Sequence, residues 1–166
     1  MPEQSVWRGS SSQWKNVGRF ILCGLFCCLV VFVFIVISHV SSGQVKAFAP
    51  YILLVLAAPI FMALSRYLQT KNKVYELTTE RLKTREGIFS KVTDTLELYR
   101  VKDLETRQPF FARLVGVENV QINTSDTSSP FIFIEAVPST VGLADKIRNQ
   151  VEAIRAQKGV REIDVE

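Results

Sequence analysis

The stretch FILCGLFCCLVVFVFIVI at residues 20–37 decides the class of this chain, because it runs for eighteen residues without a charged side chain. A second uncharged run, AFAPYILLVLAAPIFMAL, follows at residues 47–64. A bilayer core about 30 Å thick is crossed by roughly 20 mainly apolar residues in a helix, and a small extension brings both runs to that length. The pattern predicts transmembrane helices at residues 17–40 and 47–68, joined by a short outer loop at 41–46.

The spacing of the two runs favours a retained hairpin over a cleaved signal peptide. A signal peptide has a shorter apolar region, which ends at a cleavage site of small residues. Here the first run is longer, and the second follows almost directly after Ser41-Ser42-Gly43. We therefore expect both runs to stay in the mature chain as an antiparallel pair.

The distribution of charge predicts the orientation of this hairpin. Residues 1–70 hold five basic side chains and one acidic, whereas residues 71–166 hold fifteen of each. The cations of the first half flank the hairpin at its two outer ends, and the connecting loop holds only Lys46. The positive-inside rule then predicts that both termini are cytoplasmic. The basic isoelectric point is accordingly read as a topology signal, and no nucleic-acid partner is expected.

Beyond the second run, the hydrophobic period changes from helical to alternating. Strands are predicted at 74–78, at 81–86 and from Val92 onward, while residues 1–16 are predicted to be a polar tail. Leu96 and Leu98 share one phase of the alternation, and Tyr99 and Val101 have the opposite one. This change of phase predicts a bend or bulge near Leu98.

The last part of the chain predicts two further strands and one helix. Pro109 to Leu114 reads as a short helical turn with Phe110, Phe111 and Leu114 on its apolar side. Strands follow at 117–124 and 131–137. An amphipathic helix is expected from Ser139 to Gly159, followed by a tail at 160–166. Its apolar positions are Leu143, Ile147, Val151 and Ile154. Strands followed by one terminal helix make this an α+β domain, at residues 74–159.

Three stretches of this domain carry a resemblance to a known family. They are YELTTERLKTREGIF at 75–89, LELYRVKDLETRQPF at 96–110 and RLVGVENVQINT at 113–124. In this order they resemble the membrane-flanked bacterial pleckstrin-homology-like family (bPH2-type, formerly a domain of unknown function). The resemblance implies a curved sheet or barrel closed by the C-terminal helix. It also implies a bacterial inner (cytoplasmic) membrane protein with two helices before the domain, and it brings no general catalytic residues.

The residues of the chain offer little for catalysis. His39 is the only histidine, and Cys23, Cys27 and Cys28 all lie in the first apolar run. No Ser-His or Cys-His nucleophile pair and no zinc site can be assembled from the residues after position 70. The glycines there are isolated, so no phosphate-cradling loop is expected. We therefore predict a protein that is not an enzyme, with no catalytic residue, cofactor or metal.

The basic residues after the second run are one candidate binding site. On an alternating strand, Arg81, Lys83 and Arg85 fall on one face, with Lys73 and Lys91 nearby. Anionic lipid attracts cations near a membrane surface by about 1 kcal/mol each. The other interpretation is that these cations serve topology and ordinary strand solvation. If these cations do bind lipid, the domain is a lipid-headgroup-binding module, and this is the alternative function.

The segment Phe131-Ile132-Phe133-Ile134 is the second candidate, because it is apolar on both faces of its predicted strand. Such a strand is either central in its sheet or covered on one face by something else. Together with the missing chemistry, this favours a non-catalytic membrane-tethered adaptor. Its domain would bind a protein partner or a second copy of itself at the inner membrane face.

Overall fold

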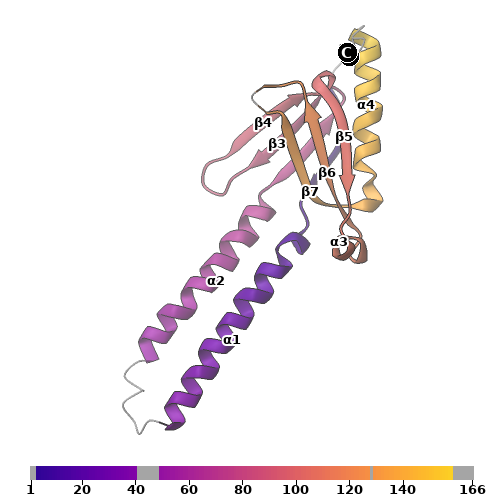
Figure 1. Cartoon of the computed structure of the whole chain (residues 1–166). Helices are drawn as coiled ribbons and strands as arrows, with labels where there is room; N and C mark the ends of the chain where they lie inside the picture. The colour runs from indigo at the N-terminus through magenta and orange to yellow at the C-terminus, as the bar shows by residue number, and fades with distance from the viewer. Residues whose placement is uncertain (1–2, 41–48, 128, 159–166) are drawn as a thin grey trace. The chain divides into compact units, whose positions relative to one another are not determined.

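The computed structural model of the chain describes residues 3–40, 49–127 and 129–158, and it divides into two compact units. One unit holds residues 16–68, and the other joins residues 1–15 to residues 69–166. The predicted α+β class is confirmed: two apolar helices precede antiparallel sheets and a C-terminal helix (Figure 1). The expected loop at 41–46 and the expected tail at 160–166 lie outside the described residues.

The first unit consists of helices α1 (Val17–Val40) and α2 (Ala49–Lys71). Both are long and apolar enough to cross a membrane. Their large side chains are mostly exposed, as Phe32 at 66% and Leu54 at 75% show. A helix that is apolar all round and uncovered differs from the core helix of a soluble protein, which buries one stripe. The starting end of α1 and the final turns of α2 line a common cavity, so the two helices are antiparallel neighbours.

The second unit contains two antiparallel sheets. The first sheet has the order β1-β2-β3-β4, and the second has the order β5-β6-β7. The strands of the first sheet are β1 (Ser5–Ser10), β2 (Val74–Thr78), β3 (Arg81–Glu86) and β4 (Val92–Glu97). Those of the second are β5 (Val101–Arg107), β6 (Val117–Thr124) and β7 (Phe131–Pro138). Helix α3 (Phe110–Leu114) connects β5 to β6, a short turn η4 (Ser139–Val141) follows β7, and α4 (Leu143–Lys158) ends the described chain.

The predicted polar tail at residues 1–16 is wrong, because this segment contributes strand β1. Gly9 pairs with Tyr75 and Trp7 with Leu77, so β1 lies antiparallel to β2. The two strands are neighbours in the sheet although α1 and α2 come between them in the sequence. The hairpin is therefore an insertion in the edge of the first sheet, and the domain is assembled from both ends of the chain.

The bend predicted near Leu98 is present as a single turn, η3 (Leu98–Arg100), between β4 and β5. It passes the chain from one sheet to the other, so Leu98 and Val101 both point into the core. On the opposite side, the Ser12 N–H donates to the carbonyl oxygen of Ala136 in β7 at 2.8 Å. Ala136 has φ +51° and lies at a register shift in the β6–β7 ladder.

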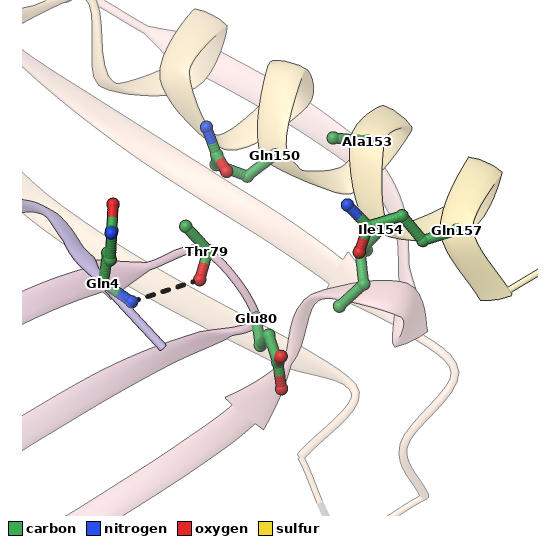
Figure 2. Close-up of a pocket in the computed structure, with 7 residues that line it drawn as sticks. All are labelled: Gln4, Thr79, Glu80, Gln150, Ala153, Ile154 and Gln157. Carbon is green, nitrogen blue, oxygen red and sulfur yellow. Dashed lines mark hydrogen bonds between the residues drawn. The ribbon is translucent and has the colours of Figure 1, made fainter. Parts of the chain in front are cut away.

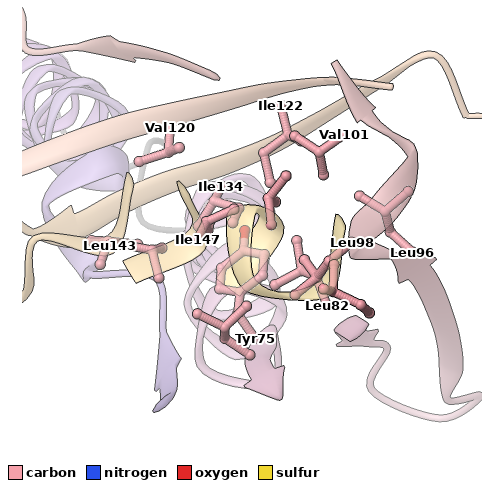
Figure 3. Close-up of a cluster of buried hydrophobic side chains, with 14 residues drawn as sticks. Tyr75, Leu82, Leu96, Leu98, Val101, Val120, Ile122, Ile134, Leu143 and Ile147 are labelled. Atoms are coloured by element: carbon pink, nitrogen blue, oxygen red, sulfur yellow. The ribbon is translucent and has the colours of Figure 1, made fainter. Parts of the chain in front are cut away.

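The closed barrel that the family resemblance implied is not observed. The extension of β1 touches β7 near Ala136 but forms no ladder with it, so the two sheets stay separate. Strand β7 is also not central, because β6 occupies the middle of its sheet and β7 forms an edge. The two sheets and α4 nevertheless share one apolar core (Figure 3). Its fully buried side chains include Tyr75, Leu77, Leu82, Leu98, Val120, Ile122, Ile134, Val137, Leu143 and Ile147.

We expect the substitution Gly9→Ala to destabilise this domain although Gly9 precedes both apolar helices. A Cβ atom at Gly9 would lie 2.3 Å from Cζ2 of Trp7, whose ring packs against the core. Overpacking of this kind costs about 1–3 kcal/mol. Unfolding of the full chain in detergent would show a lower midpoint, with a change in Trp7 fluorescence. In the control Gly18→Ala, the new Cβ meets nothing within 4 Å. Equal stability of both variants would argue against the docking of β1.

Candidate binding surfaces

The basic residues of β3 lie on one face, as their alternation predicts, but two of them are engaged inside the domain. The Arg81 Nε atom is 2.9 Å from Glu97 Oε1, and its Nη1 atom is 3.8 Å from Glu3 Oε2. Lys83 Nζ lies 3.1 Å from Glu3 Oε1. Thr78 donates a further hydrogen bond to Glu3 at 2.8 Å, and these partners hold the pKa of Glu3 below its usual range. Arg81 and Lys83 thus hold the N-terminal segment in place.

The remaining three candidate cations lie toward the other end of the same sheet. Lys73 pairs with Glu86 at 3.1 Å. Arg85 and Lys91 are exposed and form no ion pair with any residue that the structure describes. The five cations therefore do not make one basic surface. The predicted lipid-binding face on β3 is reduced to Arg85, with Lys91 in the loop that follows.

The four apolar residues of β7 separate onto two faces. Ile134 is fully buried and Ile132 is half-buried, and both face the core. Phe131 is 57% exposed and Phe133 55% exposed, on the outer face of the second sheet. Their neighbours across the ladder are Asn123 and Gln121, which carry polar side chains. The exposed pair is thus an apolar border along a polar sheet face, and it lies on an edge strand.

A second group of exposed apolar residues was not recognised as a site from the sequence. The three apolar residues of α3 are uncovered: Phe110 is 71% exposed, Phe111 79% and Leu114 69%. The rings of Phe110 and Phe111 contact each other edge to face, with centroids 5.6 Å apart. Phe89, in the loop between β3 and β4, is fully exposed. The adjacent phenylalanines after Pro109 were visible in the sequence, but a short apolar turn is ordinarily covered by its own sheet.

One cavity lies between the start of the chain, the β2–β3 turn and α4 (Figure 2). It has a volume of about 160 Å³, and its walls include Gln4, Thr79, Glu80, Gln150 and Ile154. The Gln4 backbone N–H donates to Thr79 Oγ1 at 3.3 Å across one wall. Cofactor and substrate pockets usually measure about 300–1,000 Å³. The small size makes this cavity a poor candidate for either, and Glu80 adds a single carboxylate to a lining that is otherwise amide, hydroxyl and apolar.

The described residues offer no metal site. No group of three or more His, Cys, Asp or Glu side chains is close enough among them to hold an ion. Cys23, Cys27 and Cys28 lie in α1 as free thiols. Several charged side chains of the domain form ion pairs between its own elements, such as Lys15 with Glu135 and Arg81 with Glu97.

Glu118, at the start of β6, is the one carboxyl group of the described residues whose pKa is shown to be raised. Partial burial is the main cause, and the nearby carboxylate of Asp145 adds to it. Asp145 lies in the first turn of α4, where an acidic side chain is favourable to the helix dipole. Ionised Glu118 is thus a destabilising group that the fold tolerates at this corner.

Two helices apolar enough to cross a membrane, followed by two antiparallel sheets and a closing helix, define a pleckstrin-homology-like module with exposed apolar side chains on its surface. The chain belongs to the bacterial PH domain family, whose pattern it matches over residues 20–158. This confirms the resemblance seen in the sequence. The matched region begins within α1, so β1 lies outside it. No significant match was found among curated proteins or among solved structures.

We expect Glu118→Gln to stabilise the protein at neutral pH. Folding raises the pKa of Glu118 above its value in the unfolded chain, so deprotonation of this carboxyl destabilises the folded state as the pH rises from the unfolded-state pKa through the folded-state pKa. The amide removes this cost, and the gain should vanish below the pKa of the unfolded chain, about 4.3. Thermal unfolding of the full chain at neutral and acidic pH measures the difference. Glu152→Gln, at an exposed position on α4, is the matched control. A gain that persisted unchanged at acidic pH would contradict the electrostatic cause.

Proposed function

We propose that this protein is a non-catalytic adaptor of the bacterial inner membrane. The hairpin of α1 and α2 crosses the bilayer, and the pleckstrin-homology-like domain is held at the cytoplasmic face to bind another protein chain. The observation that carries the anchor is the pairing of β1 with β2, and the exposed Phe131 and Phe133 of β7 support the binding role. Domains of this class are in general binding modules without catalysis, and the residues of this one fit that role.

The β1–β2 ladder supports a hairpin with both ends on one side of the membrane. Strands can form a ladder only if they share a compartment, and β1 and β2 are separated in sequence by two apolar helices. An even number of crossings satisfies this requirement, and a single crossing does not. The excess of basic residues outside the hairpin then favours the cytoplasm as the shared side.

The partner surface that we propose is the outer edge of β7 at Phe131 and Phe133. Large aromatic side chains dominate binding energy at protein interfaces, and an edge strand also presents unpaired backbone groups. Both phenylalanines are more than half exposed in the single chain. The candidate face on β3 supports a headgroup-binding function less well, because Glu3 and Glu97 engage Arg81 and Lys83.

The topology can be tested with a reporter fused before Met1, after Gly43 or after Glu166 in a bacterial host. We expect the two terminal fusions to report the cytoplasm and the internal one to report the outer side. The β1–β2 ladder requires the termini to agree, because it joins them in one sheet. Terminal reporters on opposite sides would refute the proposed anchor.

The adaptor role can be tested by the native mass of the full chain, extracted from its own membranes in mild detergent. We expect a complex with a second chain, which Phe131→Ser with Phe133→Ser dissociates. Loss of one central aromatic side chain costs about 2 kcal/mol, or roughly 30-fold in affinity. Val92→Ser, at an apolar β4 position that is 52% exposed, is the control and should leave the complex intact. A wild-type chain found alone, or a complex indifferent to the double substitution, would overturn this role.

A further inference from the structure

The apolar residues that the proposed adaptor surface leaves unused gather at one end of the domain. We define the linker end as the end where β1 stops at Ser10 and β2 starts at Val74, which are paired. In the first sheet, Val74 lies opposite Arg85, and Glu86 lies opposite Val92. The loop between β3 and β4, with Phe89 in it, is therefore at the linker end.

Helix α3 is at the linker end of the second sheet. Ser12, two residues after Ser10, hydrogen-bonds to Ala136 in β7. The Ala136 N–H in turn donates to Asn119 Oδ1 at 2.8 Å, which marks the beginning of β6. Because α3 ends just before β6 begins, it occupies the same end, and Figure 1 shows it where β5 turns into β6. The opposite end carries the β6–β7 turn with Thr127.

Four uncovered apolar side chains thus project from two separate tips at this end. They are Phe89 on the β3–β4 loop and Phe110, Phe111 and Leu114 on α3. A cluster of exposed apolar side chains such as that on α3 marks a contact with another molecule or a membrane more often than a single exposed residue does. Phe and Leu on the apolar face of a surface-bound segment are buried at the boundary between lipid headgroups and acyl chains.

The linker end is also the end from which the chain continues into the apolar helices. Two residues separate the last residue of α2, Lys71, from Val74, which is about 10 Å of extended chain at most. Six residues separate Ser10 from the start of α1 at Val17. If α2 crosses the bilayer, the two-residue link keeps this end of the domain within reach of the membrane surface.

The charges that flank the two tips fit an anionic leaflet. Arg85 and Lys91 border the Phe89 loop and Arg113 lies in α3; all three are exposed, without an ion pair to a described residue. Asp94 and Asp145 are exposed toward the same end, so net charge does not select the membrane. The apolar tips carry the argument, and the flanking cations add to it.

We propose that Phe89, Phe110, Phe111 and Leu114 insert into the interfacial layer of the bilayer that holds the hairpin, with Arg85, Lys91 and Arg113 among the headgroups. This inference rests on the proposed membrane anchor and goes beyond it. The two tips add contacts that fix the tilt of the domain on the membrane. The Phe131–Phe133 edge of β7 then stays free for a protein.

The test uses the full chain in vesicles of phosphatidylethanolamine and phosphatidylglycerol. Cys23, Cys27 and Cys28 are replaced by Ala, and one cysteine carries an environment-sensitive fluorophore at Phe89, Phe111, Thr127 or Phe32. Lipids with a quencher near the headgroup or deep in the acyl chain report depth. We expect Phe89→Cys and Phe111→Cys to be blue-shifted and quenched by the shallow lipid. Thr127→Cys, at the opposite end, should show neither effect.

The label in α1 separates the failure of this inference from that of the anchor. Quenching of the Phe32→Cys label by the deep lipid shows that the anchor is in place. If the labels at positions 89 and 111 are then as unquenched as the label at position 127, the insertion is overturned and the anchor stands. A blue shift at position 111 without lipid quenching would mean that protein covers α3, which also overturns it. Absence of quenching at Phe32→Cys would refute the anchor and the insertion together.

A second comparison uses substitutions that leave the core untouched, because all the residues changed are exposed. The label stays at Phe89→Cys in this comparison. The triple variant Phe110→Ser, Phe111→Ser, Leu114→Ser loses one of the two insertion points, so its label should be quenched less by the shallow lipid. Phe131→Ser with Phe133→Ser removes aromatic surface from β7 and should leave the quenching unchanged. Equal quenching in both variants would contradict a joint insertion of the two tips.

Discussion

The ladder between β1 and β2 is the constraint on which the domain depends. It places Trp7 and Gly9 opposite Leu77 and Tyr75, so the first sheet gains an edge strand from the beginning of the chain. Tyr75 is wholly buried, and its hydroxyl lies 3.4 Å from Ser11 Oγ, beyond the end of β1. The same segment then reaches the second sheet through the bond from Ser12 to Ala136. The beginning of the chain is thus the piece that links the two sheets on the side away from η3.

The contacts of this assembly determine which charged and apolar side chains remain exposed. Glu3 brings the start of the chain to the turn after β2, where it pairs with Lys83 and, together with Glu97, with Arg81. Strand alternation sends Ile134 into the core, and the phenylalanines beside it must then face outward. The residues that remain uncovered, on the edge of β7 and at the linker end, are those that the core and its ion pairs cannot use.

Much of the architecture could be predicted from the sequence because its signals are local. The apolar runs gave both helices, and the change of phase between Leu98 and Tyr99 indicated the bend that became η3. Strand β1 was missed because SVWRGS is short and polar, and its pairing with β2 depends on contacts across the whole hairpin. The edge position of β7 was missed for a related reason. A strand that is apolar on both faces is expected to be covered on both, and only the assembled sheet shows which neighbours the strand has.

The candidate sites were predicted less well than the fold. Alternation predicted Arg81, Lys83 and Arg85 on one face, but their carboxylate partners come from elsewhere: Glu3 pairs with Arg81 and Lys83, and Glu97 in β4 pairs with Arg81. The apolar turn after Pro109 was visible in the sequence as Phe110 and Phe111, and its exposure was not. Partners supplied by distant parts of a chain decide whether a charged or apolar group is available, and a pattern in one strand carries no information about them.

The insertion of the hairpin between β1 and β2 also sets the order of events during synthesis. Tyr75 lies 64 positions after Ser11, so β1 is synthesised first and can pair with β2 only after both apolar helices have been translated. A chain in which only one of these helices entered the membrane would keep the two strands on opposite sides. Strand β2, with the buried Tyr75, would then become the edge of the first sheet, and exposed apolar edge strands favour aggregation and proteolysis. In the proposed topology, the first sheet therefore gains its fourth strand only when both apolar helices have crossed the membrane, so the β1–β2 ladder depends on complete insertion of the hairpin.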